Sequence, residues 1–117
     1  MSQFKSIAIP KFSPWGRVQG GEEIAPGIVS VYTSSHGGIK VSRERLAAMP
    51  AALRDIGERS PYHHGIGWFE DDCEWCAVAV AFPDAFQRTL SDGKTSLVSM
   101  AQATLNRYFP EAAASLA

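Results

Sequence analysis

The sequence predicts an α+β fold, in which a small antiparallel sheet packs on a buried central helix and a C-terminal amphipathic helix follows. Residues 28–33 are mostly β-branched or aromatic, and residues 39–41 form a second such arm after a glycine-rich connection. Residues 75–82 are continuously apolar, while residues 95–109 carry apolar side chains at helical spacing. These observations together define the fold class.

The sheet is expected to begin near the N-terminus. Residues 5–9 alternate in polarity, which favours a short strand followed by a loop. A further strand is expected over residues 17–24, and Ala-Pro-Gly at residues 25–27 predicts a turn. Residues 28–33 and 39–41 then form a hairpin, so the sheet is predicted to be an antiparallel meander.

Two short helices are expected after the hairpin. Ser42 precedes a charged segment and is typical of a helix N-cap, and Pro50 ends that helix. Residues 51–56 form a second helical segment, closed by Gly57. Residues 58–67 are polar and contain proline and glycine, which predicts a surface loop.

The central helix is expected to start at the acidic residues 70–72, because carboxylates stabilise the positive end of the helix dipole, and to continue to residue 82. A short connection over residues 84–90 leads to the amphipathic helix at 95–109. The alanine-rich tail predicts one additional frayed turn.

Length and composition limit the function classes. The 117 residues predict a single domain over residues 1–117, and 11 basic against 12 acidic residues give no overall field that would attract nucleic acid or an anionic membrane. The sequence shows neither a signal-peptide pattern nor an apolar run of membrane-spanning length. Cys73 and Cys76 are three positions apart in the expected helix, where a disulfide is difficult to close, which favours the cytoplasm.

His36 is the first candidate for chemistry. It follows two serines at the end of a strand, and an imidazole titrates near neutral pH, as a general base requires. The simpler interpretation is that Gly37 and Gly38 form a hairpin turn in which His36 is merely tolerated.

The acidic segment with Cys73 and Cys76 is the second candidate, because a helix N-terminus favours a thiolate and carboxylates with thiols can bind metals. Structural zinc needs four ligands, and one Cys-x-x-Cys pair leaves only the histidines to complete such a site: His36, His63 and His64. No glycine pattern fits a phosphate. We therefore expect no metal and no cofactor, with two small buried thiols at a helix start as the simpler interpretation.

The enzymatic alternative is a small hydrolase or transferase. In it, His36 acts with Cys73 or with the nearby carboxylates; in the version with Cys73, this residue is the nucleophile, His36 the base, and Glu70 or Asp71 orients the imidazole. This arrangement requires the hairpin tip to pack against the start of the helix.

Trp15 and Trp68 both lie next to glycines in expected turns. Exposed tryptophans would mark a surface that binds another protein. The alternative is that they cap the ends of the core.

Several motifs occur in order along the chain: Trp-Gly at residues 15–16, Ser-His-Gly-Gly at 35–38 and Gly-Trp-Phe-Glu-Asp-Asp-Cys-Glu-Trp at 67–75. Over about residues 14–86 the chain resembles a domain-of-unknown-function family of proteobacterial chromosomes, plasmids and phage-related regions. The resemblance carries no established activity. By analogy, it implies a mobile-element protein that blocks a host defence complex, as anti-CRISPR proteins do.

The sequence therefore favours a small protein-binding module over an enzyme. Clustered carboxylates can mimic phosphates and occupy a basic nucleic-acid channel of a partner protein. The expected contact residues are Trp68, Glu70, Asp71, Asp72 and Glu74.

Overall fold

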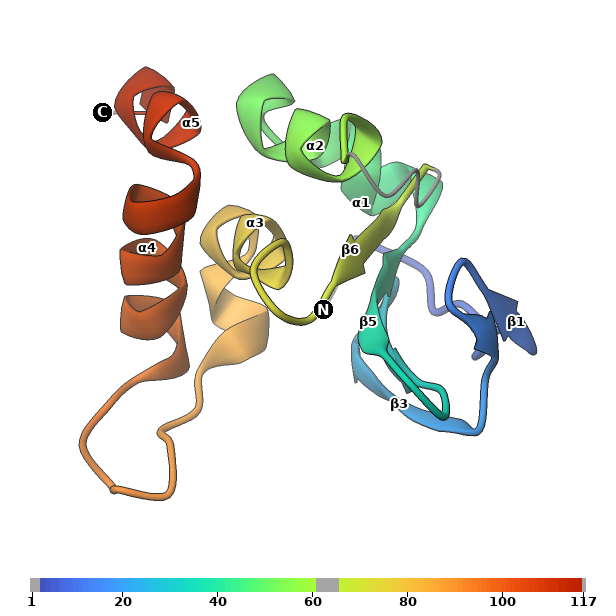
Figure 1. Cartoon of the computed structure of the whole chain (residues 1–117). Helices are drawn as coiled ribbons and strands as arrows, with labels where there is room; N and C mark the ends of the chain where they lie inside the picture. Colours follow the sequence, from blue (N-terminus) through green and yellow to red (C-terminus); the bar gives the residue numbers. More distant parts are fainter. Residues whose placement is uncertain (1–2, 61–65, 117) are drawn as a thin grey trace.

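The structure is a computed structural model that describes residues 3–60 and 66–116. Its main sheet has four antiparallel strands in the order β3-β4-β5-β6, and a separate two-stranded hairpin precedes it (Figure 1). The strands are β1 (Phe12–Ser13), β2 (Gly16–Arg17), β3 (Gly20–Ala25), β4 (Ile28–Tyr32), β5 (Gly37–Val41) and β6 (Trp68–Glu70). The predicted α+β class and antiparallel meander are confirmed.

The helices surround one face of this sheet. They are α1 (Arg43–Ala48), α2 (Ala51–Glu58), α3 (Trp75–Ala81), the 3-10 helix η1 (Pro83–Phe86), α4 (Leu97–Tyr108) and α5 (Pro110–Leu116). The side chain of Ser42 caps α1 by accepting a hydrogen bond from the backbone N–H of Arg45 at 3.1 Å, as expected. None of the helices in the described ranges is long and apolar enough to cross a membrane.

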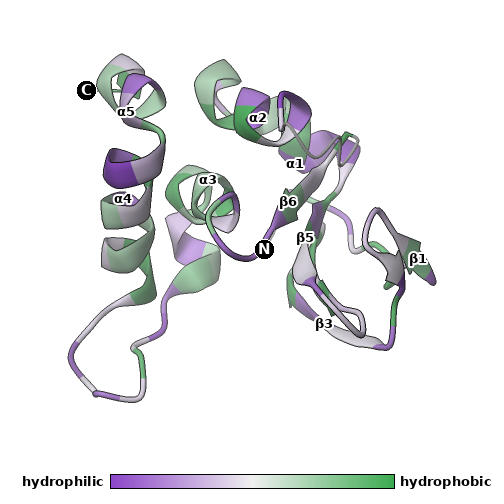
Figure 2. Cartoon of the chain, viewed as in Figure 1, coloured by the Kyte–Doolittle hydropathy of each residue, from purple (hydrophilic) through white to green (hydrophobic). Residues whose placement is uncertain are grey.

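The core lies between the sheet and the helices. Phe69 of β6, Ile28 of β4, Val78 of α3 and Leu105 of α4 are all completely buried in it. Helix α3 contacts α2, α4 and β6, and Figure 2 shows it as hydrophobic around most of its circumference. This helix has the buried central position that its apolar sequence predicts.

The other face of the sheet is covered by the N-terminal segment. Val29 and Val31 are buried, but they do not belong to the core that lies between the sheet and the helices. Trp15, in the turn between β1 and β2, packs directly on Gly38 of β5. Figure 1 shows the β1–β2 hairpin on the side of the sheet opposite α3 and α4. The sheet is therefore sandwiched between two unequal layers.

Two predictions in the N-terminal half are wrong. Residues 5–9 form no strand; they run as irregular chain. Gly37 and Gly38 belong to β5 rather than to a turn. The turn is formed by residues 33–36, before β5. Here the side-chain oxygen of Thr33 accepts hydrogen bonds from the backbone N–H groups of Ser35 and His36. The threonine closes the turn, so glycine is not needed for it.

The predicted start of the central helix is also wrong. Glu70 is the last residue of β6, and α3 begins only at Trp75. The acidic residues therefore lie in a turn between strand and helix, not in the first turn of a helix. The tail forms the seven-residue helix α5 instead of one frayed turn. The loop prediction for residues 58–67 concerns His63 and His64, which lie outside the described residues.

Candidate functional site

Glu70, Asp71, Asp72, Cys73 and Glu74 form what we term the acidic turn, which connects β6 to α3. One Glu70 oxygen, Oε1, accepts hydrogen bonds from the backbone N–H groups of Cys73 at 2.8 Å and Glu74 at 3.1 Å. The other oxygen, Oε2, accepts from the N–H of Asp72 at 2.8 Å. The carboxylate thereby satisfies backbone donors that the turn would otherwise leave without partners.

Glu74 makes the reciprocal contact with the backbone of Glu70. Its residue is 5% exposed, and its Oε1 accepts a hydrogen bond from the backbone N–H of Glu70 at 3.2 Å. Each glutamate thus holds the backbone of the other, in the manner of a capping box. Both carboxylates are engaged within the fold, and Glu74 is too deeply buried to be presented to a partner.

Asp71 and Asp72 are exposed in the same turn. The backbone N–H of Asp71 donates to the carbonyl of Gly37 at 3.0 Å, which fixes the turn beside the β4–β5 hairpin. Partial burial raises the pKa of the Asp71 carboxyl, and the charges of Asp72 and Glu70 raise it further, whereas His36 opposes them weakly. The exposed negative charge of the turn is therefore carried mainly by two aspartates.

A groove of about 450 Å³, which we term the Tyr32 groove, lies beside Asp71 between the sheet and the start of α4. Its wall includes two large exposed side chains, Tyr32 at 56% and Met100 at 42%. The remaining lining is mostly apolar and includes Ile24, Ile39, Trp75, Leu90 and Leu97. This groove places a carboxylate at the edge of an apolar depression.

The surroundings of the two thiols disfavour their thiolate forms. Burial raises the pKa of Cys73, and Glu70, Asp72 and Glu74 raise it further. Burial also raises the pKa of Cys76 to about 12. A reactive cysteine needs a lowered pKa, and the predicted position at a helix N-terminus would lower the pKa of Cys73. Cys73 instead precedes α3 and is surrounded by carboxylates, so its pKa is not lowered.

His36 meets only one member of the predicted triad. The hairpin end does lie against the acidic turn, as the triad requires, and the charge of His36 acts on Asp71. Among the described residues, the charges that act on Cys73 are those of the surrounding carboxylates. The charge of His36 thus acts on an aspartate, and it is not among the charges that act on the thiol of Cys73.

Metal ligation in the described parts of the chain is limited to one acidic group. Oxygens of Glu70, Asp71 and Asp72 lie within 4.8 Å of one another, a donor set suited to a hard cation such as Ca²⁺ or Mg²⁺. Both Glu70 oxygens already accept backbone hydrogen bonds. No group containing Cys73 or Cys76 with a histidine is assembled within residues 3–60 and 66–116.

Trp15 and Trp68 pack against each other, with ring centroids 5.5 Å apart in an edge-to-face arrangement. The ammonium of Lys40 lies 5.1 Å from the ring of Trp68 and donates to the carbonyl of Ile66 at 3.0 Å. Both tryptophans are half-buried. They cover the sheet face opposite the helices and are not part of the core that lies against the helices.

Arg45 is a buried charge that the sequence analysis missed. Its position between Glu44 and Leu46 at the start of a helix is typical of a solvated arginine, yet only 7% of the residue is exposed. Its covering side chains, Phe4 and Phe82, are distant in the sequence. No local pattern could therefore have identified it.

No curated protein and no solved structure matches the chain. A family model described as a domain of unknown function, DUF7007, matches residues 8–117. This range includes the acidic turn, the Tyr32 groove and Arg45, and it confirms the expected relation to an uncharacterised family. The chain therefore belongs to the DUF7007 family.

Proposed function

We propose that this protein is a binding module whose Tyr32 groove, with Asp71 in its lining and the exposed Asp72 next to it in the chain, holds a basic and partly apolar segment of a partner protein. The observation that supports this most directly is the position of the exposed Asp71 carboxylate in the lining of an apolar groove. A lysine or arginine side chain combines a cationic end with an apolar stem, so it matches both parts of this surface.

The electrostatics of the acidic turn favour such a partner. Asp71 lies near Asp72 and Glu70, and their repulsion contributes to its raised pKa. A cation bound at this point relieves the repulsion. The apolar lining adds contact area beside the charges, with Tyr32 and Met100 as the large exposed side chains.

The proposed partner class is a protein with a basic nucleic-acid channel. Paired carboxylates resemble successive phosphates and compete for the same lysines and arginines. By analogy with small proteins of plasmids and phages, we propose a bacterial defence complex as the target, which would make this protein an inhibitor of the anti-CRISPR type. The binding surface contains Asp71 and Asp72, because Glu70 and Glu74 are engaged in the turn.

The enzymatic alternative has less support. A Cys73 nucleophile needs a base and a stabilised thiolate, whereas burial and the adjacent carboxylates raise the pKa of this thiol.

The test is capture from a proteobacterial cell extract at low salt by three versions of the immobilised protein. The wild type is compared with Asp71→Asn/Asp72→Asn and with Glu44→Gln/Glu58→Gln. The last variant removes the same charge from exposed positions on α1 and α2. We expect a stoichiometric partner on the wild type and the glutamine control, and its loss from the asparagine variant.

Competition then tests the phosphate-mimic mechanism. Excess single-stranded DNA should displace the captured partner, and raising the salt concentration should weaken the complex steeply. A partner that binds the asparagine variant equally well would exclude the acidic edge as the contact. An absence of any stoichiometric partner would remove the support for a binding module.

A further inference from the structure

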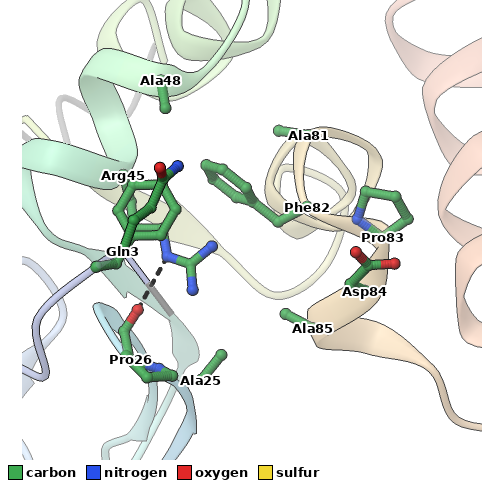
Figure 3. Close-up of a pocket in the computed structure, with 11 residues that line it drawn as sticks. Gln3, Ala25, Pro26, Arg45, Ala48, Ala81, Phe82, Pro83, Asp84 and Ala85 are labelled. Carbon is green, nitrogen blue, oxygen red and sulfur yellow. Dashed lines mark hydrogen bonds between the residues drawn. The ribbon is translucent and has the colours of Figure 1, made fainter. Parts of the chain in front are cut away.

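A second groove, on another part of the molecule, is built around Arg45 and is independent of the acidic turn. This Arg45 groove has a volume of about 530 Å³ and lies where the N-terminal segment, α1 and η1 meet (Figure 3). Phe4, Pro26, Phe82, Pro83 and Asp84 contribute to its walls. The volume is within the range of about 300 to 1,000 Å³ that holds small organic ligands.

The guanidinium of Arg45 lies against two aromatic rings that are themselves in contact. Its central carbon lies 3.9 Å from the ring centroid of Phe4 and 4.7 Å from that of Phe82. The rings themselves pack edge to face, with centroids 5.9 Å apart. These contacts, together with the hydrogen bond to Pro26, favour one orientation of the guanidinium before a ligand binds.

The hydrogen-bonding capacity of Arg45 is only partly used. Its Nε donates to the carbonyl of Pro26 at 2.9 Å. Within residues 3–60 and 66–116, the terminal nitrogens of Arg45 have no hydrogen-bond acceptor and no ion-pair partner. Figure 3 shows one of these nitrogens on the side of the groove where Phe82 lies and the other on the side of Ala25 and Ala85. A residue that is 7% exposed thus retains several donors that face the cavity.

We propose that the Arg45 groove binds a carboxylate carried on an apolar group. The two oxygens of a carboxylate match the terminal nitrogens of a guanidinium in a bidentate pair. The apolar part of the ligand then packs on the groove walls, and the partly desolvated cation gains a counter-ion. Asp84 at the rim disfavours a more highly charged anion such as a phosphate dianion.

The probes are phenylacetate, its neutral analogue phenylacetamide, and a short peptide that ends in phenylalanine with a free carboxylate. Binding is followed by the NMR signal of the Arg45 Nε–H group, which reports directly on the guanidinium. Phenylacetate and the peptide represent a free acid and a chain terminus, and the tighter of the two identifies the source of the carboxylate. Phenylacetamide should produce no saturable shift.

Ala48 supplies a variant that blocks the site without removing Arg45. It is exposed, lines the groove and lies three positions after Arg45 on α1, so a longer side chain there reaches the guanidinium. Ala48→Glu should weaken carboxylate binding by about tenfold or more, because its own carboxylate competes. Ala48→Gln, matched in size, should bind as the wild type does. Asp84→Asn should tighten binding by about twofold, since an exposed charge has a small effect.

Three results would each overturn this inference. The first is the absence of a saturable Arg45 shift with both carboxylate probes. The second is equal binding of phenylacetate and phenylacetamide. The third is unchanged binding in Ala48→Glu, which would show that the carboxylate binds outside the Arg45 groove. None of these results depends on Asp71 or Asp72, so the proposed protein partner is tested separately.

Discussion

The carboxylate of Glu74 and the guanidinium of Arg45 belong to residues that are 5% and 7% exposed, yet their chemical situations differ. Glu74 accepts a backbone hydrogen bond and is part of a closed exchange with Glu70. Arg45 lies against two aromatic rings, has one carbonyl partner among the described residues, and directs its terminal donors to a cavity. Burial alone therefore does not distinguish a structural charge from a ligand-binding charge; the satisfaction of its hydrogen bonds does.

The reactivity of the thiols provides the largest expected effect and tests how closed the acidic turn is. Burial raises the pKa of Cys76 from 9.0 to about 12, so its thiolate at pH 8 is roughly 1,000 times scarcer than that of an ordinary cysteine. We expect iodoacetamide to modify both cysteines much more slowly in the native protein than in urea, as measured by mass spectrometry. Faster modification of Cys73 in the native state would instead revive the enzymatic alternative.

Replacing Glu70 tests the structural side of the comparison. Glu70→Ala removes the acceptor for three backbone N–H groups of the turn, and we expect the free energy of unfolding to fall by about 3 kcal/mol. Urea denaturation measures this change. Asp72→Ala, an exposed neighbour, is the control and should change stability by less than about 0.5 kcal/mol. Equal effects of both substitutions would show that the turn does not depend on Glu70.

The substitution Arg45→Met tests how much the buried arginine contributes to stability. The substitution loses the hydrogen bond to Pro26 and the ring contacts, but it also removes a buried charge that has no counter-ion in the described part of the chain. We expect a loss of about 1 kcal/mol in the free energy of unfolding, because the desolvation of the cation offsets part of its interactions. The same urea titration applies. A loss larger than that of Glu70→Ala would reverse the comparison and make Arg45 primarily structural.

The smallest effect is expected for Asp71. Because its pKa is raised in the folded state, the native protein binds this proton more tightly than the unfolded chain does, and stability declines as the pH rises through the native pKa. Asp71→Asn should therefore be more stable than the wild type at pH 7 by a few tenths of a kcal/mol, since the side chain is exposed. Thermal unfolding should show this difference disappearing below about pH 3.8, the ordinary carboxyl pKa. A difference that grows toward acid pH would contradict the assigned direction.

Local patterns in the sequence predict most of the fold. The β-branched run of β4, the Ser42 cap and the apolar periodicity of α3 and α4 each depend on neighbours in the chain. Strand β6 was missed because it is three residues long and is held by pairing with β5, as in the Ile39–Phe69 pair. Acidic residues also favour helix starts, so the local signal at Glu70 pointed to the wrong element.

The candidate sites were less predictable than the fold. The sequence identified the acidic segment, but it could not show that Glu70 and Glu74 turn inward while Asp71 and Asp72 remain exposed. The Arg45 groove depends on Phe4 and Phe82, which approach the arginine only after folding. Positions of this kind depend on tertiary contacts and have no sequence spacing to reveal them.

The effect of replacing a glycine in β5 should depend on a second residue at Gly37 but not at Gly38. A methyl group on Gly37 would come within 2.8 Å of the Asp71 carboxylate oxygen, the end of a side chain that can move or be shortened. A methyl group on Gly38 would meet both the Trp15 ring and the backbone carbonyl of Phe69, the latter at 2.6 Å. A second-site change at Asp71 can therefore remove the closest contact of an alanine at position 37 and leave only a tight approach of 3.0 Å to the carbonyl of Val31, whereas no smaller residue at position 15 can remove the clash with the Phe69 carbonyl at position 38. Of these two glycine positions in β5, only position 37 has a closest contact that a substitution elsewhere in the chain can remove.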